Sequence, residues 1–289
     1  MIVTKNKVNT YLKLVKFSHT VFAMPFAFIG YFLAIHQGYR LDWIKLFLVL
    51  LCMVFARNAA MAFNRFADRE IDIKNPRTAI REIPQGIVKP GSALKFVLIN
   101  SFAFIITTAF INGLTLILSP VALSVVLGYS ITKKFTSLCH FILGLGLSLA
   151  PIGAYLAITG KFSWLPVLFS CVVLFWVSGF DIIYALQDEA FDKTENLRSI
   201  PAKTGIKNAI LISSIIHAGC SVFVILSGII GHFGIWYWIG SILFISLLIY
   251  QHILVKPNDL SKLNQAFFTA NGIASIVFSV FTIIDFMIQ

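Results

Sequence analysis

Residues 64–72 read NRFADREID and directly follow a long apolar segment. Asn64, Asp68 and Asp72 recur at intervals of four, which places their side chains on one face of an α-helix. The stretch therefore predicts a helix that crosses an apolar medium. It also predicts a stripe of carboxylate and amide oxygens where that helix leaves the medium.

A second acidic stretch lies far downstream. Residues 181–192 read DIIYALQDEAFD, and again an apolar segment precedes them. The segments 68–82 and 181–195 together hold nine of the chain's twelve Asp and Glu residues. The pattern Arg-x-Ile-Pro accompanies each stretch, at 81–84 and at 198–201. The chain therefore contains an internal repeat, with one acidic stretch in each copy.

The composition indicates an integral membrane protein. Hydrophobic residues make up 58% of the 289 residues and charged residues only 12%, which is outside the range of soluble domains. Apolar runs of roughly 20 residues recur, the length with which a helix crosses a bilayer core, whereas a β-barrel would show alternating segments of about ten. We predict an all-α bundle of nine transmembrane helices, built as one domain (residues 1–289) from two four-helix repeats plus one helix. The expected spans are 17–36, 43–66, 93–112, 115–132, 137–159, 163–187, 208–230, 235–255 and 265–287.

Lysine and arginine are distributed unevenly over the connections between these spans. Alternate connections hold nineteen of the twenty-three, and the opposite connections hold only Arg40, Lys45 and Lys161. The positive-inside rule then predicts a cytoplasmic amino terminus in a bacterial-type inner membrane. Both acidic stretches fall on the cytoplasmic side, in cap loops at about 67–92 and 188–207. The net charge of +11 is therefore attributed to contact with anionic lipid, and no nucleic-acid partner is expected.

Carboxylates gathered at two helix ends need a counter-charge. If both stretches face one cavity, up to five carboxylates converge near the membrane surface, where they repel and raise one another's pKa. Mg²⁺ would relieve this repulsion, because it binds one or two carboxylates and takes its other ligands from water and phosphate oxygens. Arginine and lysine side chains surround both stretches and would bind a diphosphate. A diphosphate at the surface with a hydrocarbon tail between the helices describes a prenyl diphosphate.

The two stretches resemble motifs of the UbiA superfamily of intramembrane aromatic prenyltransferases, NxxxDxxxD and a DxxY element followed by DxxxD. They stand here as Asn64, Asp68 and Asp72 and as Asp181, Tyr184, Asp188 and Asp192. The segment from Tyr129 to Lys133 resembles the YxxxK element of the family, and His19 lies in a further element of the first span. Residues 75–78 and 81–84 look most like the branch that holds 4-hydroxybenzoate polyprenyltransferases and related enzymes of menaquinone synthesis.

The resemblance implies a reaction and a role for each candidate residue. A polyprenyl diphosphate ionises to an allylic cation, which an electron-rich ring attacks while water is excluded. The implied ligands of Mg²⁺ are Asp68, Asp72, Asp188 and Asp192, of which Asp68 and Asp188 are also counted as catalytic. The groups implied to bind the diphosphate are Asn64, Arg65, Lys74, Arg77, Lys133 and Arg198. Asp181 and Tyr184 lie deeper and are the catalytic groups implied to orient or deprotonate the ring.

Several assignments stay open at this level. Arg57 either snorkels to the surface or binds the carboxylate of an aromatic acid, and His19 either packs or reaches the substrate cavity. His140, His217 and His252 lack the spacing of metal ligands and are interpreted as packing residues. The expected acceptor is 4-hydroxybenzoate, for ubiquinone or menaquinone biosynthesis, and the alternatives are a naphthoate or a haem or chlorophyll precursor. No obligate protein partner is evident.

A cation-coupled transporter is the alternative from another functional class. Transporters usually hold charged residues near the midplane of the bilayer, often on interrupted helices. Here the deepest acid is Asp181, which precedes Asp188 by about two helical turns. Mixed charge at a helix end can also be a solvated rim without function. The surface position of the other acids disfavours a transporter, and the occurrence of the motif at two equivalent positions disfavours a solvated rim.

Overall fold

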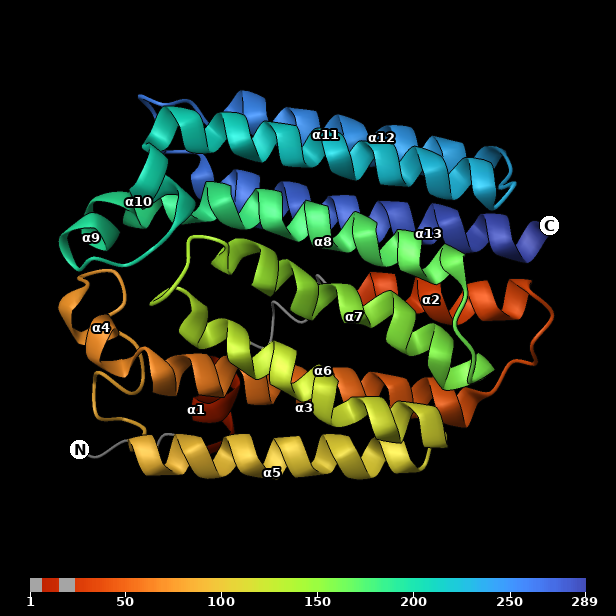
Figure 1. The fold of residues 1–289 in the computed structure, drawn as a ribbon, viewed down its shortest axis with the longest axis horizontal. Coiled ribbons are helices and arrows are strands. Elements are labelled where there is room, and N and C mark those ends of the chain that lie inside the picture. The colour runs from red at the N-terminus through yellow and green to blue at the C-terminus, as the bar shows by residue number, and fades with distance from the viewer. Residues whose placement is uncertain (1–6, 16–23) are drawn as a thin grey trace.

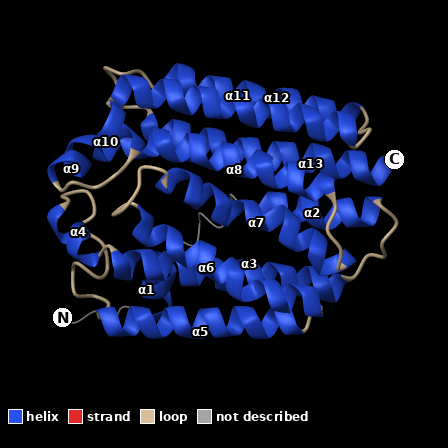
Figure 2. Cartoon of the chain, viewed as in Figure 1, coloured by secondary structure: helices blue, strands red, loops and turns tan. Residues whose placement is uncertain are grey.

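The structure, a computed structural model, describes residues 7–15 and 24–289. Within these ranges all regular elements are helices, and the β-type pairing is confined to an isolated bridge between Lys256 and Asp259 (Figure 2). Long apolar stretches without strand alternation account for this result. The predicted all-α fold is therefore confirmed.

Eight helices in the described ranges are long and apolar enough to cross a membrane. They are α3 (Trp43–Ala67), α5 (Pro90–Ala109), α6 (Gly113–Thr132), α7 (Cys139–Thr159), α8 (Trp164–Ala185), α11 (Ile206–Ile230), α12 (Ile235–Leu254) and α13 (Asn271–Ile288), which continues the π-helix Gln265–Ala270. A shorter apolar helix, α2 (Met24–His36), precedes them. Residues 16–23 of the predicted first span lie outside the described residues, so the count of nine spans stays a prediction. The chain is a multi-pass membrane protein.

The long helices run side by side in one bundle (Figure 1). Helix α8 packs against α7 and α11, while α3 packs against α5, and α12 against α13. The remaining described elements are short: the helices α1 (Lys7–Leu14), α4 (Arg69–Lys74), α9 (Glu189–Thr194) and α10 (Ile200–Thr204), and a 3-10 turn at Leu186–Asp188. Helices α4, α9 and α10 gather at one end of the bundle, and the carboxyl terminus lies at the other end (Figure 1). Both acidic stretches therefore meet at a single end, which we call the cap end.

Both acidic stretches contain a break in the helix. Helix α3 ends before Asp68, which has φ −94° and ψ 3° and immediately precedes α4. In the second copy α8 ends at Ala185, a 3-10 turn follows, and Asp188 has φ −104° and ψ 3° before α9. A continuous helical stripe was expected through each stretch, and that expectation is wrong. Aspartate is a weak helix former that favours helix ends, so the chain turns at Asp68 and Asp188 and folds α4 and α9 over the bundle.

One half of the bundle has a solid aromatic core. The rings of Phe26, Phe169, Trp176, Phe244 and Phe278 are fully buried where α2, α8, α12 and α13 meet. Aromatic side chains of this size bury large apolar areas and pack at specific tilts. This half therefore forms a rigid support for the second acidic stretch, which α8 carries.

Candidate active site

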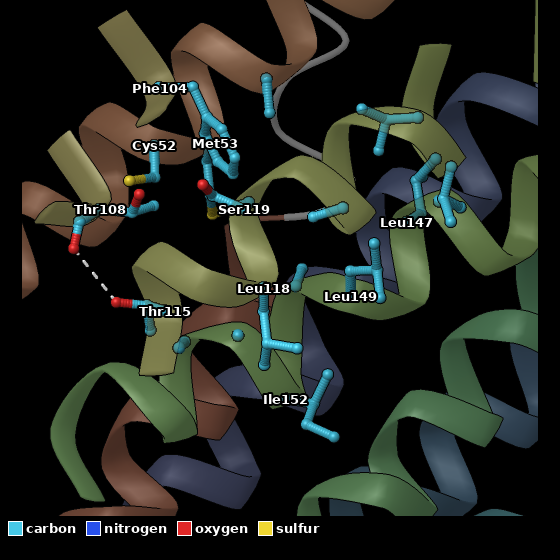
Figure 3. A pocket seen from close by; sticks show the side chains of 18 of the residues that line it. Cys52, Met53, Phe104, Thr108, Thr115, Leu118, Ser119, Leu147, Leu149 and Ile152 are labelled. Atoms are coloured by element: carbon cyan, nitrogen blue, oxygen red, sulfur yellow. Dashed lines mark hydrogen bonds between the residues drawn. The ribbon is translucent and has the colours of Figure 1, made fainter. Parts of the chain in front are cut away.

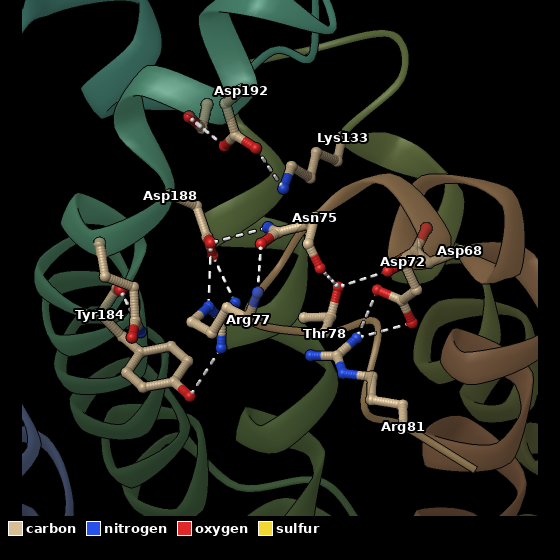
Figure 4. Close-up of polar contacts among 12 residues, drawn as sticks. Asp68, Asp72, Asn75, Arg77, Thr78, Arg81, Lys133, Tyr184, Asp188 and Asp192 are labelled. Carbon is tan, nitrogen blue, oxygen red and sulfur yellow. Dashed lines mark hydrogen bonds and ion pairs between the residues drawn. The ribbon is translucent and has the colours of Figure 1, made fainter. Parts of the chain in front are cut away.

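Asp188 is held by the loop that follows the first acidic stretch. Arg77 donates from Nε to Oδ1 over 2.9 Å and from Nη2 to Oδ2 over 2.5 Å (Figure 4). Asn75 adds a hydrogen bond from Nδ2 to Oδ1 over 3.0 Å, and its own Oδ1 accepts the backbone N–H of Arg77 over 2.9 Å. Paired forks of this kind are among the stronger polar contacts in proteins. The two copies of the repeat are thus joined at the cap end.

Asp72 is buried and bound by an arginine of the same loop. Arg81 donates from Nη1 to both carboxylate oxygens over 2.7 and 2.8 Å (Figure 4). The Thr78 hydroxyl donates to the backbone oxygen of Asp72 over 3.1 Å, which closes the loop onto α4. The carboxylate of Asp72 is therefore neutralised within its own copy of the repeat.

Asp192 occupies the equivalent place in the second copy and is fully buried. The Lys133 ammonium lies 2.7 Å from Oδ1, and the Ser199 hydroxyl donates to Oδ2 over 2.9 Å. Lys133 follows α6, at the end of the YxxxK element, so a third part of the chain reaches the cap end. Lys133 was predicted to bind the diphosphate, and in the structure its ammonium forms an ion pair with Asp192.

Asp68 differs from the other three aspartates, because no ion pair to it is formed within the described ranges. It accepts one hydrogen bond from Asn64 Nδ2 over 3.1 Å. Burial raises the pKa of Asp68 to about 6, the negative charge of Asp72 acts in the same direction, and Lys133, Lys134 and Arg81 act against them. Asp68 is therefore the carboxylate that an added cation would stabilise most.

The donor set at the cap end suits a hard divalent cation. In the described part of the chain no three His, Cys, Asp or Glu side chains lie close enough to hold a metal ion together. Three of the aspartates are instead paired with arginine or lysine. Mg²⁺ requires only one or two carboxylates, with water and substrate phosphate completing its shell. The carboxylate and amide oxygens present fit Mg²⁺ bound together with a diphosphate.

Three residues expected to bind the diphosphate have other partners. Lys74 is largely exposed and lies 2.6 Å from Glu195. Arg198 donates from Nη1 to the backbone oxygen of Phe135 over 2.7 Å. Arg65 is buried, and its Nε lies 3.4 Å from the backbone oxygen of Leu14.

Arg77 and Lys133 are therefore the two of the five predicted cations that contact the aspartates. Their roles toward a substrate remain predictions, as does that of His19, which lies outside the described residues. Asn75, Arg81 and Ser199 also contact the aspartates. The sequence placed Arg81 only among the basic residues around the acids, and it assigned no role to Asn75 or Ser199. The sequence feature that could have identified them is the segment 75–84, whose Arg-x-Ile-Pro pattern recurs at residues 198–201.

The deeper pair of candidates also has defined partners. Asp181 Oδ2 lies 2.7 Å from Nδ1 of His140, which is buried. The interpretation of His140 as a packing residue is therefore incomplete. The Tyr184 hydroxyl accepts from Arg77 Nη1 over 3.4 Å, and its ring stacks on Phe267 with centroids 4.0 Å apart.

An apolar cavity of about 390 Å³ lies between α3, α5, α6 and α7 (Figure 3). Arg57, Met61 and Tyr129 line it toward the cap end, and Ile111 and Phe162 line it at the opposite end. The Nε of Arg57 is buried without a hydrogen-bond partner among the described residues. A buried N–H group without a partner is energetically costly, so Arg57 stays a candidate for binding a ligand in the cavity.

Comparison with known proteins gives one consistent family. The model of the UbiA prenyltransferase family matches residues 23–273. The chain is 30% identical over 243 residues to the 4-hydroxybenzoate octaprenyltransferase of Nitrosomonas europaea, which covers 82% of this chain and 81% of that protein. It is 28% identical over 240 residues to the protein of the same name from Aliivibrio fischeri strain MJ11, with 82% of each chain covered.

Solved structures agree with this result. The apo structure of a UbiA homolog from Aeropyrum pernix K1 superposes with a TM-score of 0.84 at 30% identity, covering 93% of this chain and 98% of that one. A UbiA homolog from Archaeoglobus fulgidus, solved with DMAPP and Mg²⁺, shares the fold at a TM-score of 0.75 and 18% identity, covering 97% and 100% of the two chains. The predicted resemblance is confirmed, and the chain belongs to the UbiA prenyltransferase family.

Proposed function

We propose that this prenyltransferase joins a polyprenyl chain from a polyprenyl diphosphate to an aromatic acid, with 4-hydroxybenzoate as the acceptor, in a Mg²⁺-dependent step of quinone biosynthesis. One observation carries the proposal: the apolar cavity is lined by Arg57, whose Nε is buried without a hydrogen-bond partner among the described residues, on the side toward the cap end, where the four aspartates lie. The names of the relatives from Nitrosomonas and Aliivibrio support the acceptor. The DMAPP and Mg²⁺ bound by the Archaeoglobus homolog support the donor and the metal.

The diphosphate end of the donor would bind at the cap end. Mg²⁺, with each ion held by one or two of Asp68, Asp72, Asp188 and Asp192, would neutralise the diphosphate as it leaves. The Arg77 guanidinium and the Lys133 ammonium each lie on one of these carboxylates, within reach of a phosphate bound beside them. Arg77 can offer two parallel N–H groups, a geometry that matches phosphate oxygens.

The prenyl tail would occupy the apolar cavity. Its lining comes almost entirely from apolar side chains, with small residues such as Gly146, Ala150 and Gly153 on α7. A Cβ atom at Gly153 would meet no other atom within 4 Å, so open space adjoins the helix there. A hydrocarbon chain gains from burial in such a space, and water is excluded from the allylic cation.

The acceptor would bind where Arg57 and Tyr129 line the cavity. Tyr129 lies within electrostatic range of Arg57, Asp68 and Asp181, so a ring placed beside it would have both a cation and carboxylates nearby. Arg57 would bind the carboxylate of the acid. Asp181 would accept the phenol proton, and Tyr184 would help to orient the ring.

The reaction balances without a redox step. The allylic C–O bond breaks and its electron pair leaves with the diphosphate, which Arg77 and Lys133 stabilise. A ring carbon beside the hydroxyl then forms the new C–C bond as Asp181 takes the hydroxyl proton. Loss of the C–H proton from that carbon restores the aromatic ring, and Asp181 returns its proton to the oxygen. One proton is released for each diphosphate formed.

The test uses purified full-length protein with radiolabelled polyprenyl diphosphate, Mg²⁺ and 4-hydroxybenzoate, and products are identified by mass spectrometry. We expect prenylated 4-hydroxybenzoate, with its formation abolished by EDTA and restored by Mg²⁺. If products form only with a naphthoate or a haem precursor, the proposed acceptor is wrong and the proposed type of reaction is retained. The proposal as a whole fails if no aromatic acceptor is prenylated. Accessibility of cap-end cysteine substitutions in sealed inner-membrane vesicles would test the proposed cytoplasmic orientation.

A further inference from the structure

His140 lies at the start of α7, next to the deeper end of the candidate site. Its side chain is buried, with 3% of its surface exposed, and Nδ1 lies 2.7 Å from Asp181 Oδ2. The Asp181 side chain keeps 23% of its surface exposed. A buried imidazole therefore supports a carboxylate that remains accessible on its other side.

The second ring nitrogen of His140 fixes which nitrogen carries the proton. The backbone N–H of Ile200 points to Nε2 over 3.3 Å. A backbone N–H can only donate, so Nε2 must present a lone pair and cannot be protonated. The proton of the neutral ring then resides on Nδ1 and is donated to Asp181.

The segment that sets this tautomer also holds a candidate metal ligand. Ser199 donates to Asp192 Oδ2 over 2.9 Å, and Ile200, the next residue, donates to His140. Asp192 belongs to the region proposed to bind the diphosphate, while Asp181 belongs to the region proposed to bind the acceptor. Residues 199–200 thus connect the two halves of the site through His140.

We propose that His140 is a positioning residue for prenyl transfer, which holds the Asp181 carboxylate in the orientation that receives the acceptor hydroxyl. The inference rests on the proposed function, because it assumes an acceptor that Asp181 contacts. A hydrogen bond of this kind fixes the orientation of a catalytic base. Where a similar hydrogen bond orients a metal ligand, its loss typically lowers affinity or activity about 10- to 100-fold.

Three substitutions separate positioning from packing. His140→Asn keeps an N–H donor near the place of Nδ1, His140→Gln moves the amide toward the place of Nε2, and His140→Leu removes both functions. We expect the Leu and Gln variants to lose about 10- to 100-fold in kcat, with KM for the prenyl diphosphate within about twofold of the parent. The Asn variant should recover most of this loss. The proposal would be overturned if all three variants lost the same factor in kcat and were equally reduced in thermal stability. Full activity of the Leu variant would also overturn it.

A spectroscopic measurement tests the same inference without turnover. In protein labelled with ¹⁵N-histidine, the signals that disappear in His140→Asn identify His140. We expect them to report a neutral ring with the proton on Nδ1, and to shift in Asp181→Asn. A proton on Nε2 alone or on both nitrogens would overturn the inference. Failure of the wild-type enzyme to prenylate any aromatic acid would instead reject the proposed function, and the nitrogen spectrum distinguishes the two failures.

Discussion

Arg77 and Asp188 make a two-point contact between the two copies of the repeat, with Nε 2.9 Å from Oδ1 and Nη2 2.5 Å from Oδ2. The arginine follows α4 and the aspartate directly precedes α9, so the contact ties the two interrupted helices together. In the proposed reaction the same guanidinium also faces the diphosphate. Its planar fork is the property that matters for both contacts.

Arg77→Lys should therefore impair the enzyme although the charge is kept. Lysine is a point charge that cannot form the paired contact, so we expect kcat/KM for the prenyl diphosphate to fall about 10- to 100-fold. Steady-state kinetics with varied donor would measure the loss. Arg69→Lys is the matched control, because Arg69 pairs with Glu70, whose side chain is 80% exposed. Donor kinetics of Arg77→Lys equal to those of the control would contradict the role of the fork.

Asp68→Asn should abolish transfer and yet stabilise the metal-free protein at high pH. Because the pKa of Asp68 is raised from 3.8 to about 6, its ionised carboxylate destabilises the folded state above pH 6. This destabilisation is absent below pH 4, where the carboxyl group is protonated. The penalty is at most about 3 kcal/mol and is reduced by solvent screening. We expect the thermal midpoint in detergent to rise for Asp68→Asn at pH 8 and to stay unchanged near pH 4.

Added Mg²⁺ should narrow this difference at pH 8, because the cation would stabilise the wild-type carboxylate. A variant less stable than the wild type at pH 8, with or without Mg²⁺, would show that the Asp68 charge is already compensated. Transfer activity in Asp68→Asn comparable to the wild type would remove Asp68 from the proposed metal ligands.

The order and length of the spans could be predicted from the sequence because each depends on a local apolar run. The predicted span 115–132, for example, differs by two residues from α6 (Gly113–Thr132). The partners at the site depend on distant parts of the chain and could not be obtained in this way. Arg81 and Arg198 occupy equivalent places in the repeat, but Arg81 binds Asp72, whereas Arg198 binds a backbone oxygen after α6. Repetition in sequence therefore predicted two equivalent acidic stretches, and the fold then gave them different partners.

Arg57→Met should raise KM for an acceptor that carries a carboxylate and leave the kinetics of an uncharged acceptor unchanged. The guanidinium lines the cavity and its Nε has no hydrogen-bond partner among the described residues, so a carboxylate is the expected ligand. We expect KM for 4-hydroxybenzoate to rise about 10- to 100-fold, since a charged hydrogen bond within a buried site is lost. Phenol, which lacks the carboxylate, is expected to be a poor substrate of both enzymes to the same degree. An equal loss with both acceptors would indicate that Arg57 acts on structure or on the donor.

Lys74→Ala should have little effect on transfer, although the sequence placed Lys74 among the diphosphate ligands. Its side chain is 59% exposed and paired with Glu195, and surface ion pairs contribute about 0 to 1 kcal/mol. We expect kcat/KM to change by less than about fivefold, the factor that corresponds to 1 kcal/mol. Kinetics with varied donor at low and high salt would measure the change. A loss as large as that of Arg77→Lys would restore Lys74 to the diphosphate site.

Gly153→Phe should shorten the donors that the enzyme accepts. Gly153 lines the cavity thirteen residues along α7 from His140, or about 20 Å at the rise of an α-helix. No neighbouring atom lies within 4 Å of the place where its Cβ would be, so a larger side chain can start there without a clash at Cβ. A short tail would end before this position, whereas a long tail must pass it. We therefore expect transfer from geranyl diphosphate to be kept and transfer from octaprenyl diphosphate to fall by at least about tenfold.

Gly128→Phe is the matched control for this substitution. A Cβ at Gly128 likewise meets nothing within 4 Å, but Gly128 on α6 does not line the cavity. Competition between the two donors, with products resolved by mass spectrometry, cancels differences in protein yield and folding. At fixed donor concentrations the product ratio depends only on the relative kcat/KM of the donors, so a shift in Gly153→Phe and none in Gly128→Phe would assign the cavity to the tail. An unchanged ratio in both variants would mean that the tail takes another path between the helices.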